Sequence, residues 1–132
     1  MDEEIFRISR SVARAKSLKD MAEDRLADII HETKTYKIVE QYYEVIKELI
    51  TALMYTDGFK TLSHKSLIFY LEKNYGKHFS RDEIVFMDET RKLRNDILYY
   101  GKHVDKSFLV NHEGELKFII KKLLKITEEK LK

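Results

Sequence analysis

Apolar residues recur along the chain with the period of an α-helix. The stretch from residue 36 to about residue 56 has the widest apolar face, made of Val39, Tyr42, Tyr43, Ile46, Leu49, Ile50, Leu53 and Met54. Spacings of three and four positions place these side chains on one side of a helix. We therefore expect this helix to lie at the centre of the protein and to be its most buried element.

The first stretch, residues 2 to 31, predicts one long helix. Its apolar positions alternate in spacing between three and four, as in the seam of a helical bundle, and are Ile5, Ile8, Val12, Ala15, Ala22, Leu26 and Ile29. Three acidic residues at positions 2–4 suit the positive end of a helix dipole. The pattern therefore predicts helix from the first residues onward.

Polar residues and glycines mark the limits of the remaining helices. Ser80 and Glu83 have capping-box spacing, which predicts a helix over residues 81–100 that ends at Gly101. Two more helices are expected over residues 64–75 and from about 107 almost to 132. The other expected caps are Thr33 or Thr35, Ser63 and Ser107 at helix starts, and Gly58 and Gly76 at helix ends.

Composition supports an all-α protein. The 132 residues include no proline and four glycines, and 43% are hydrophobic, which favours long helices and one domain over residues 1–132. We expect an up-and-down helical bundle without a sheet. The absence of cysteine excludes disulfides and thiol chemistry, and the net charge of +2 gives no bulk basic field. With no apolar run of membrane-spanning length and no signal peptide, a cytoplasmic protein is expected.

The stretch from residue 91 to residue 102 concentrates the candidate chemistry. One face of this helix is expected to carry Leu93, Ile97 and Tyr100. Arg91, Arg94 and Asn95 then lie at the edge of that face, and Asn95 lies four positions from Tyr99, within contact distance on a helix. A guanidinium beside an apolar stripe needs acceptors or a partner molecule.

Three segments between residues 37 and 104 resemble the HEPN superfamily (higher eukaryotes and prokaryotes nucleotide-binding). The matching segments are KIVEQYYEVIKELI (37–50), TLSHKS (61–66) and RKLRNDILYYG (91–101). The resemblance implies an antiparallel four-helix bundle with an additional short helix. It also implies a symmetric homodimer formed through the signature helices. Many members are metal-independent endoribonucleases, and others pair with a small nucleotidyltransferase, often as toxin and antitoxin.

This chain departs from the family pattern at the catalytic histidine. Active members carry an arginine, a polar residue and then a histidine, with four to six residues between the arginine and the histidine. The residues at those spacings are Tyr99, Tyr100 and Gly101 counted from Arg94, and Asp96, Ile97 and Leu98 counted from Arg91. His103 lies beyond the helix-ending glycine. A tyrosine with an ordinary pKa near 10 is a poor general base at neutral pH.

Three functions follow from these observations. The first is a dimeric HEPN module, weakly catalytic or inactive, that partners a minimal nucleotidyltransferase or binds RNA or nucleotide phosphates through Arg94 and Asn95. The second is an endoribonuclease that uses Arg94 and Asn95 with Tyr99. The third is a structural helical adaptor. The expected phosphate-binding residues are Arg91, Arg94 and Lys102, and the expected dimer contacts are Arg91, Arg94, Leu98 and Tyr99. No metal ion or cofactor is expected.

Structural roles compete with these functional ones. Arg94 and Asn95 can instead order the bundle through hydrogen bonds, and Arg91 is interpreted mainly as an ion-pair partner of Asp88 or Glu89. His64 lies at a helix start. It is interpreted first as a packing or capping residue and only second as a catalytic base. The tyrosines at positions 42, 43 and 70 are expected in the core.

Overall fold

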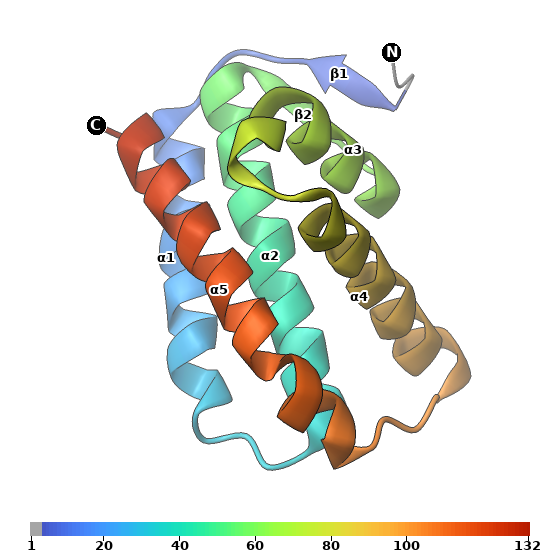
Figure 1. Ribbon diagram of the computed structural model, residues 1–132. Helices are drawn as coiled ribbons and strands as arrows, with labels where there is room; N and C mark the ends of the chain where they lie inside the picture. Colours follow the sequence, from blue (N-terminus) through green and yellow to red (C-terminus); the bar gives the residue numbers. More distant parts are fainter. Residues whose placement is uncertain (1–3) are drawn as a thin grey trace.

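The computed structural model describes residues 4–132, which fold into five α-helices and two short strands (Figure 1). The helices are α1 (Val12–Ile29), α2 (Thr35–Asp57), α3 (His64–Tyr75), α4 (Arg81–Tyr100) and α5 (Lys106–Lys130). The strands are β1 (Ile5–Arg7) and β2 (Phe59–Thr61), and one turn of 3-10 helix, Gly76–His78, follows α3. The expectation of a mostly helical bundle is confirmed.

Helix α2 is the centre of the bundle. It contacts all four other helices, and more than half of its residues are buried, including the wide apolar face expected from the sequence. Its tyrosines Tyr42 and Tyr43 are almost fully buried, as is Tyr70 of α3. The expectation that this helix is the most buried one is therefore confirmed.

The four long helices, α1, α2, α4 and α5, run between the two ends of the bundle. Helices α2 and α5 begin at the lower end in Figure 1 and finish at the upper end, whereas α1 and α4 run downward and α3 lies across the upper part. The lower end thus brings together the start of α2, the end of α4 and the start of α5.

The prediction of one helix over residues 2–31, with no sheet in the fold, is wrong. Residues 5–7 form β1, which pairs antiparallel with β2 so that Phe6 lies opposite Lys60. The amide of Ile8 then donates to the carbonyl of Gly58 at 2.9 Å, and α1 begins only at Val12, where Ser11 caps it. Residues 2 and 3 of the predicted helix lie outside the described residues. The apolar spacing continues through this boundary, so periodicity alone does not mark it.

The capping predictions around α4 are confirmed. Both hydrogen bonds of the Ser80–Glu83 capping box are present, and Gly101 ends the helix with a left-handed φ of 64°. Gly58 ends α2 with a φ of 87°, and a Cβ there would lie 3.1 Å from the carbonyl oxygen of Ile8. Glycine at position 58 therefore allows both the turn and the approach of the segment that follows β1.

Two other caps differ from the prediction. The N-cap of α2 is Lys34, which makes no side-chain hydrogen bond there, and not Thr33 or Thr35. The Glu32 carboxylate accepts hydrogen bonds from the amides of residues 33 and 34 in the preceding turn. Helix α5 begins at Lys106 after Asp105, so Ser107 lies inside its first turn.

One carboxylate links three helices at the upper end of the bundle. Asp57, the last residue of α2, accepts hydrogen bonds from the hydroxyl groups of Tyr70 and Tyr75 at 2.6 Å each, and pairs with Lys130 at 2.7 Å. Burial alone would raise the pKa of Asp57, but these three donors outweigh it and hold the pKa below its ordinary value. The ends of α2, α3 and α5 are joined at this point.

In the part of the chain that the structure describes, no helix combines the length and the apolar character needed to cross a membrane.

Candidate functional site

Arg94 lies on α4 where that helix packs against α2. Its Nη2 is 2.9 Å from Oε1 of Glu44, its Nη1 donates to Oδ1 of Asn95 at 3.4 Å, and its Cζ lies 5.5 Å from the centre of the Tyr43 ring. Only 16% of the Arg94 side chain is exposed. The guanidinium is therefore fixed by one carboxylate and one aromatic face, and it holds Asn95 beside it.

Glu44 is shared between two cations. The ammonium of Lys47 lies 2.7 Å from Oε2 of Glu44, and Arg94 occupies Oε1. Burial alone would raise the pKa of Glu44, but the hydrogen bonds and charges of Lys47 and Arg94 lower it. The carboxyl group is thus ionised at neutral pH, and the three side chains carry a net charge of about +1.

The Tyr43 ring links Arg94 to His64. The hydroxyl of Tyr43 is 3.0 Å from Nδ1 of His64, and the two rings stack with centroids 5.7 Å apart. Burial raises the pKa of Tyr43, so its hydroxyl stays protonated and can donate a hydrogen bond to Nδ1 of His64. Burial, followed by the charges of Arg94 and Lys47, lowers the pKa of His64. We therefore assign a neutral His64 that carries its proton on Nε2.

Arg91 is an ion-pair partner of Asp88, as one interpretation expected. Its Nε donates to Oδ1 of Asp88 at 2.8 Å. Lys102 lies beyond the end of α4, 3.8 Å from Asp96. The three residues expected to bind phosphate are thus each paired with an acid, and only Arg91 and Arg94 lie within one turn of each other.

The last turn of α4 is open to solvent. Leu98, Tyr99 and Tyr100 are 50%, 68% and 82% exposed, so on the face expected to carry Leu93, Ile97 and Tyr100 the burial ends at Ile97 and Tyr100 lies in solvent. Ile97 packs with Val39 and Val104, whereas this end of the helix extends past the apolar contacts of the bundle. In the described part of the chain the Tyr99 hydroxyl makes no side-chain hydrogen bond, and the ring of Tyr43, not that of Tyr99, lies against the Arg94 guanidinium.

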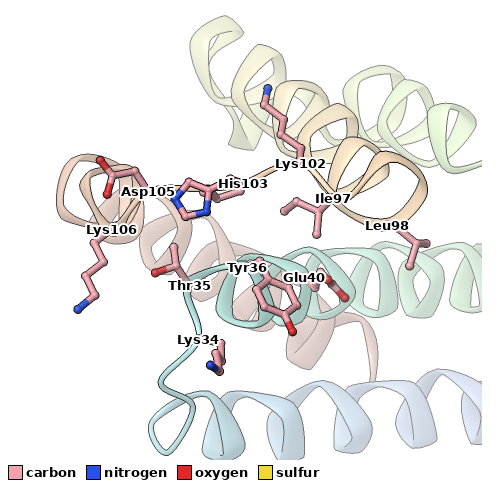
Figure 2. Close-up of a pocket in the computed structure, with 12 residues that line it drawn as sticks. Lys34, Thr35, Tyr36, Glu40, Ile97, Leu98, Lys102, His103, Asp105 and Lys106 are labelled. Carbon is pink, nitrogen blue, oxygen red and sulfur yellow. The ribbon is translucent and has the colours of Figure 1, made fainter.

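A cavity of about 770 Å³ lies at this lower end, between the start of α2, the end of α4 and the start of α5 (Figure 2). Its lining residues are Lys34, Thr35, Tyr36, Glu40, Ile97, Leu98, Gly101, Lys102, His103, Val104, Asp105 and Lys106. The first turns of both α2 and α5 border it, and neither helix has a side-chain cap there. Of the predicted site residues, the cavity includes Leu98 and Lys102 but neither Arg91 nor Arg94.

Several residues of these sites were outside the sequence prediction. Glu44 and Lys47 lie on α2, fifty and forty-seven positions before Arg94, and nothing in local spacing pairs them with it. His64 was identified only as a minor candidate, although it reaches the Arg94 network through Tyr43. No group of three or more metal-binding side chains occurs among the residues that the structure describes.

Comparisons of the chain with protein-family models, with curated proteins and with solved structures found no match. The fold and the candidate sites therefore rest on the sequence and the geometry.

Proposed function

We propose that this protein is a HEPN-like module that forms a homodimer through α4 and binds RNA or nucleotide phosphates at Arg94 and Asn95. The course of the helices supports the proposal: α1, α2, α4 and α5 alternate in direction, as in an antiparallel four-helix bundle, and α3 is the additional short helix (Figure 1). A minimal nucleotidyltransferase is the protein partner suggested by the resemblance.

The observation that carries the proposal is the fixed guanidinium of Arg94. Its planar group is oriented by Glu44 and Tyr43 and lies next to the amide of Asn95. A phosphate that exchanged with Glu44 would meet a cation in place, since Lys47 would still neutralise the displaced carboxylate. Glu44 would then act as an internal competitor for the anion.

The open end of α4 supports the homodimer. Its exposed leucine and two tyrosines, residues 98–100, form an apolar and aromatic surface next to the proposed site. In an isologous contact each of these side chains would meet the same surface of the second copy. Aromatic residues are enriched in such interfaces.

We expect little or no endoribonuclease activity. RNA cleavage of this kind needs a base that takes the proton of the 2′-hydroxyl and a cation for the charge that develops on phosphorus. Arg94 can supply the cation but never the base. The Tyr99 side chain is solvent-exposed and makes no hydrogen bond to Arg94 among the described residues, and the assigned tautomer of His64 already carries a proton on Nε2. Losing a general base costs roughly 100- to 10,000-fold in rate.

Fluorescence anisotropy with a labelled single-stranded RNA tests the binding. Arg94→Ala should weaken binding about tenfold, as expected for loss of one charge-assisted contact, and Glu44→Gln should strengthen it. Arg81→Ala is the matched control, because Arg81 forms an ion pair with Glu72 at the other end of α4. Equal effects of the substitutions at positions 81 and 94 would contradict the proposed site.

A cleavage assay with structured and unstructured RNAs tests the lack of activity. Robust cleavage by the parent protein, lost in Arg94→Ala and in Tyr99→Phe, would overturn this part of the proposal in favour of the endoribonuclease. Cleavage lost in Arg94→Ala and His64→Ala but kept in Tyr99→Phe would assign the base to His64.

A further inference from the structure

We propose that α1 of one copy of this protein docks against α5 of a second copy through two rows of exposed, oppositely charged side chains. The acidic row consists of Asp20, Asp24 and Asp28 on α1, and the basic row consists of Lys117, Lys121 and Lys125 on α5. Neither row includes a residue of the Arg94 network, of the open end of α4 or of the cavity. The inference therefore stands independently of the RNA site and of the dimer proposed through α4.

Each row is a continuous stripe on its helix. A step of four positions advances about 6 Å along a helix axis and turns the side chain by only about 40°, so three such residues line up over about 12 Å. All six residues are exposed. The buried positions of α1, which are Ala15, Ala22 and Ile29, lie on the side that packs against the bundle, and those of α5 do the same. Both rows therefore lie on surfaces turned away from the core.

The charges within each row are not balanced by the rest of the fold. No member of either row forms an ion pair among residues 4–132, whereas Lys19, on the side of α1 next to α5, pairs with Glu23 and lies 3.9 Å from Glu128. Like charges four positions apart on a helix repel one another and destabilise it. An opposite charge from outside the chain would relieve this repulsion in both rows.

A second copy of the chain is the partner that fits both rows. The rows have the same length and the same spacing, and their charges are opposite. Residues four positions apart form ridges inclined to the helix axis, and two helices packed through these ridges cross at about −50°, a common angle in globular proteins. In that arrangement each aspartate of one copy lies opposite a lysine of the other. A lone charged row would attract any surface of opposite charge, but here the same chain carries the complement of each row.

An exposed apolar side chain lies beside the centre of each row. Met21, 45% exposed, precedes Asp24 by three positions, and Phe118, 56% exposed, precedes Lys121 by three positions. Residues three apart are neighbours on a helix surface. The contact would therefore cover some apolar surface of both helices, and salt does not screen this contribution.

The contact is expected to be weak and to depend on salt. Exposed ion pairs stabilise little individually, and the Debye length falls from roughly 20 Å in about 20 mM salt to roughly 4 Å in about 500 mM salt. We therefore expect association at about 0.5 mM protein in the low salt and its loss in the high salt. The α4 contact is formed by a leucine and two tyrosines and should persist in both. Salt thus separates the two interfaces.

Exchange of the charges tests the contact by light scattering under these two salt conditions. The weight-average mass of the parent should be about 1.4-fold higher in low salt than in high salt, as for a Kd of about 1 mM. Each row variant alone should lose this gain, because its two rows carry the same sign. An equimolar mixture of the two should regain it, because each row again meets the opposite sign, and this recovery also shows that both variants are folded. One row variant combines Asp20→Lys, Asp24→Lys and Asp28→Lys, and the other combines Lys117→Asp, Lys121→Asp and Lys125→Asp.

A third variant is the control for net charge. It combines Lys65→Asp, Lys73→Asp and Lys77→Asp, which changes the net charge by the same amount as the second row variant, at exposed lysines outside both rows. It should keep the salt-dependent gain in mass. Absence of the gain in the parent would overturn the inference, as would its retention in either row variant, its equal loss in the control, or a mixture that regains nothing. A monomeric mass in high salt would instead contradict only the α4 dimer.

Discussion

The two ends of the bundle differ in how their charged side chains are paired. At the upper end Asp57 receives two tyrosine hydroxyls and one ammonium, which join α2, α3 and α5. At the lower end the same central helix begins beside a cavity, and the exposed side chains of Lys34 and Lys106 form no ion pair in the described part of the chain. The charged groups described at the upper end are paired between helices, whereas those at the lower end are more exposed and only partly paired.

Because of this difference, the charged groups of the upper end should contribute to the stability of the fold, and those of the lower end should contribute little to it. A half-buried carboxylate with three donors stabilises the fold, because removing it leaves those donors without an acceptor. An exposed lysine without a partner contributes little to stability and keeps its charge for an incoming anion. Substitutions at the two ends should therefore change different measured quantities.

The largest effect is expected for Asp57→Ala. It removes the acceptor of Tyr70, Tyr75 and Lys130 together, and we expect the free energy of unfolding to fall by about 3 kcal/mol in urea denaturation. Asp105→Ala at the lower end is the matched control and should change it by less than about 0.5 kcal/mol. Equal losses for both variants would contradict the contrast between the ends.

Acid should weaken the upper end through the same carboxylate. The folded-state pKa of Asp57 lies below its ordinary value of 3.8 because of its three donors. Its stabilisation is therefore complete above about pH 4 and is lost as the pH falls through the lowered folded-state pKa. Urea denaturation between pH 6 and pH 2.5 should show a steeper loss for the parent than for Asp57→Asn. Parallel curves would mean that Asp57 does not contribute to the pH dependence.

A smaller loss of stability is expected for Arg94→Met. The change leaves Glu44 half-buried but still paired with Lys47, so the free energy of unfolding should fall by about 1 kcal/mol. Arg81→Met breaks an exposed pair with Glu72 and should cost less than about 0.5 kcal/mol. A loss of several kcal/mol for Arg94→Met would identify Arg94 as a structural residue above all.

The smallest effect on stability is expected at the open end of α4. Leu98→Asp should leave the free energy of unfolding within about 0.5 kcal/mol, because Leu98 is half exposed. The same variant should convert the proposed dimer into a monomer in light scattering at micromolar concentration. Val110→Asp, at an exposed position of α5, should leave the mass unchanged. A parent protein that is already monomeric would refute the dimer.

The sequence predicted those elements whose causes are local. The central helix followed from its apolar period, and α4 followed from the Ser80–Glu83 box and Gly101, whose bonds span only a few positions. The strand pair was missed because Ile5–Arg7 continues the helical spacing of its neighbours. Its partner, Phe59–Thr61, comes after both α1 and α2 in the sequence, so no local pattern indicates the pairing. Ser11 was the local signal for the true start of α1.

The candidate site divides in the same way. The neighbours Arg94 and Asn95 were identified from the signature stretch, and Asp88 was one of two predicted partners of Arg91. The acid that holds Arg94 comes from another helix, and so do Tyr43 and His64. Contacts between helices depend on their relative rotation, which spacing along one helix does not determine. The cavity was missed for this reason as well, since three separate segments form it.

The pairing of β1 with β2 has a kinetic consequence. It joins residues 5–7 to the connection after α2, so forming it closes a loop that contains both α1 and α2. Contacts that close a long loop are slow to form and are often the first to open. Native-state hydrogen exchange should then show the amides of residues 5–8 exchanging through local opening, far ahead of those in α2. Release of this segment would also uncover Gly58, so the turn that ends the central helix would become accessible to a protease.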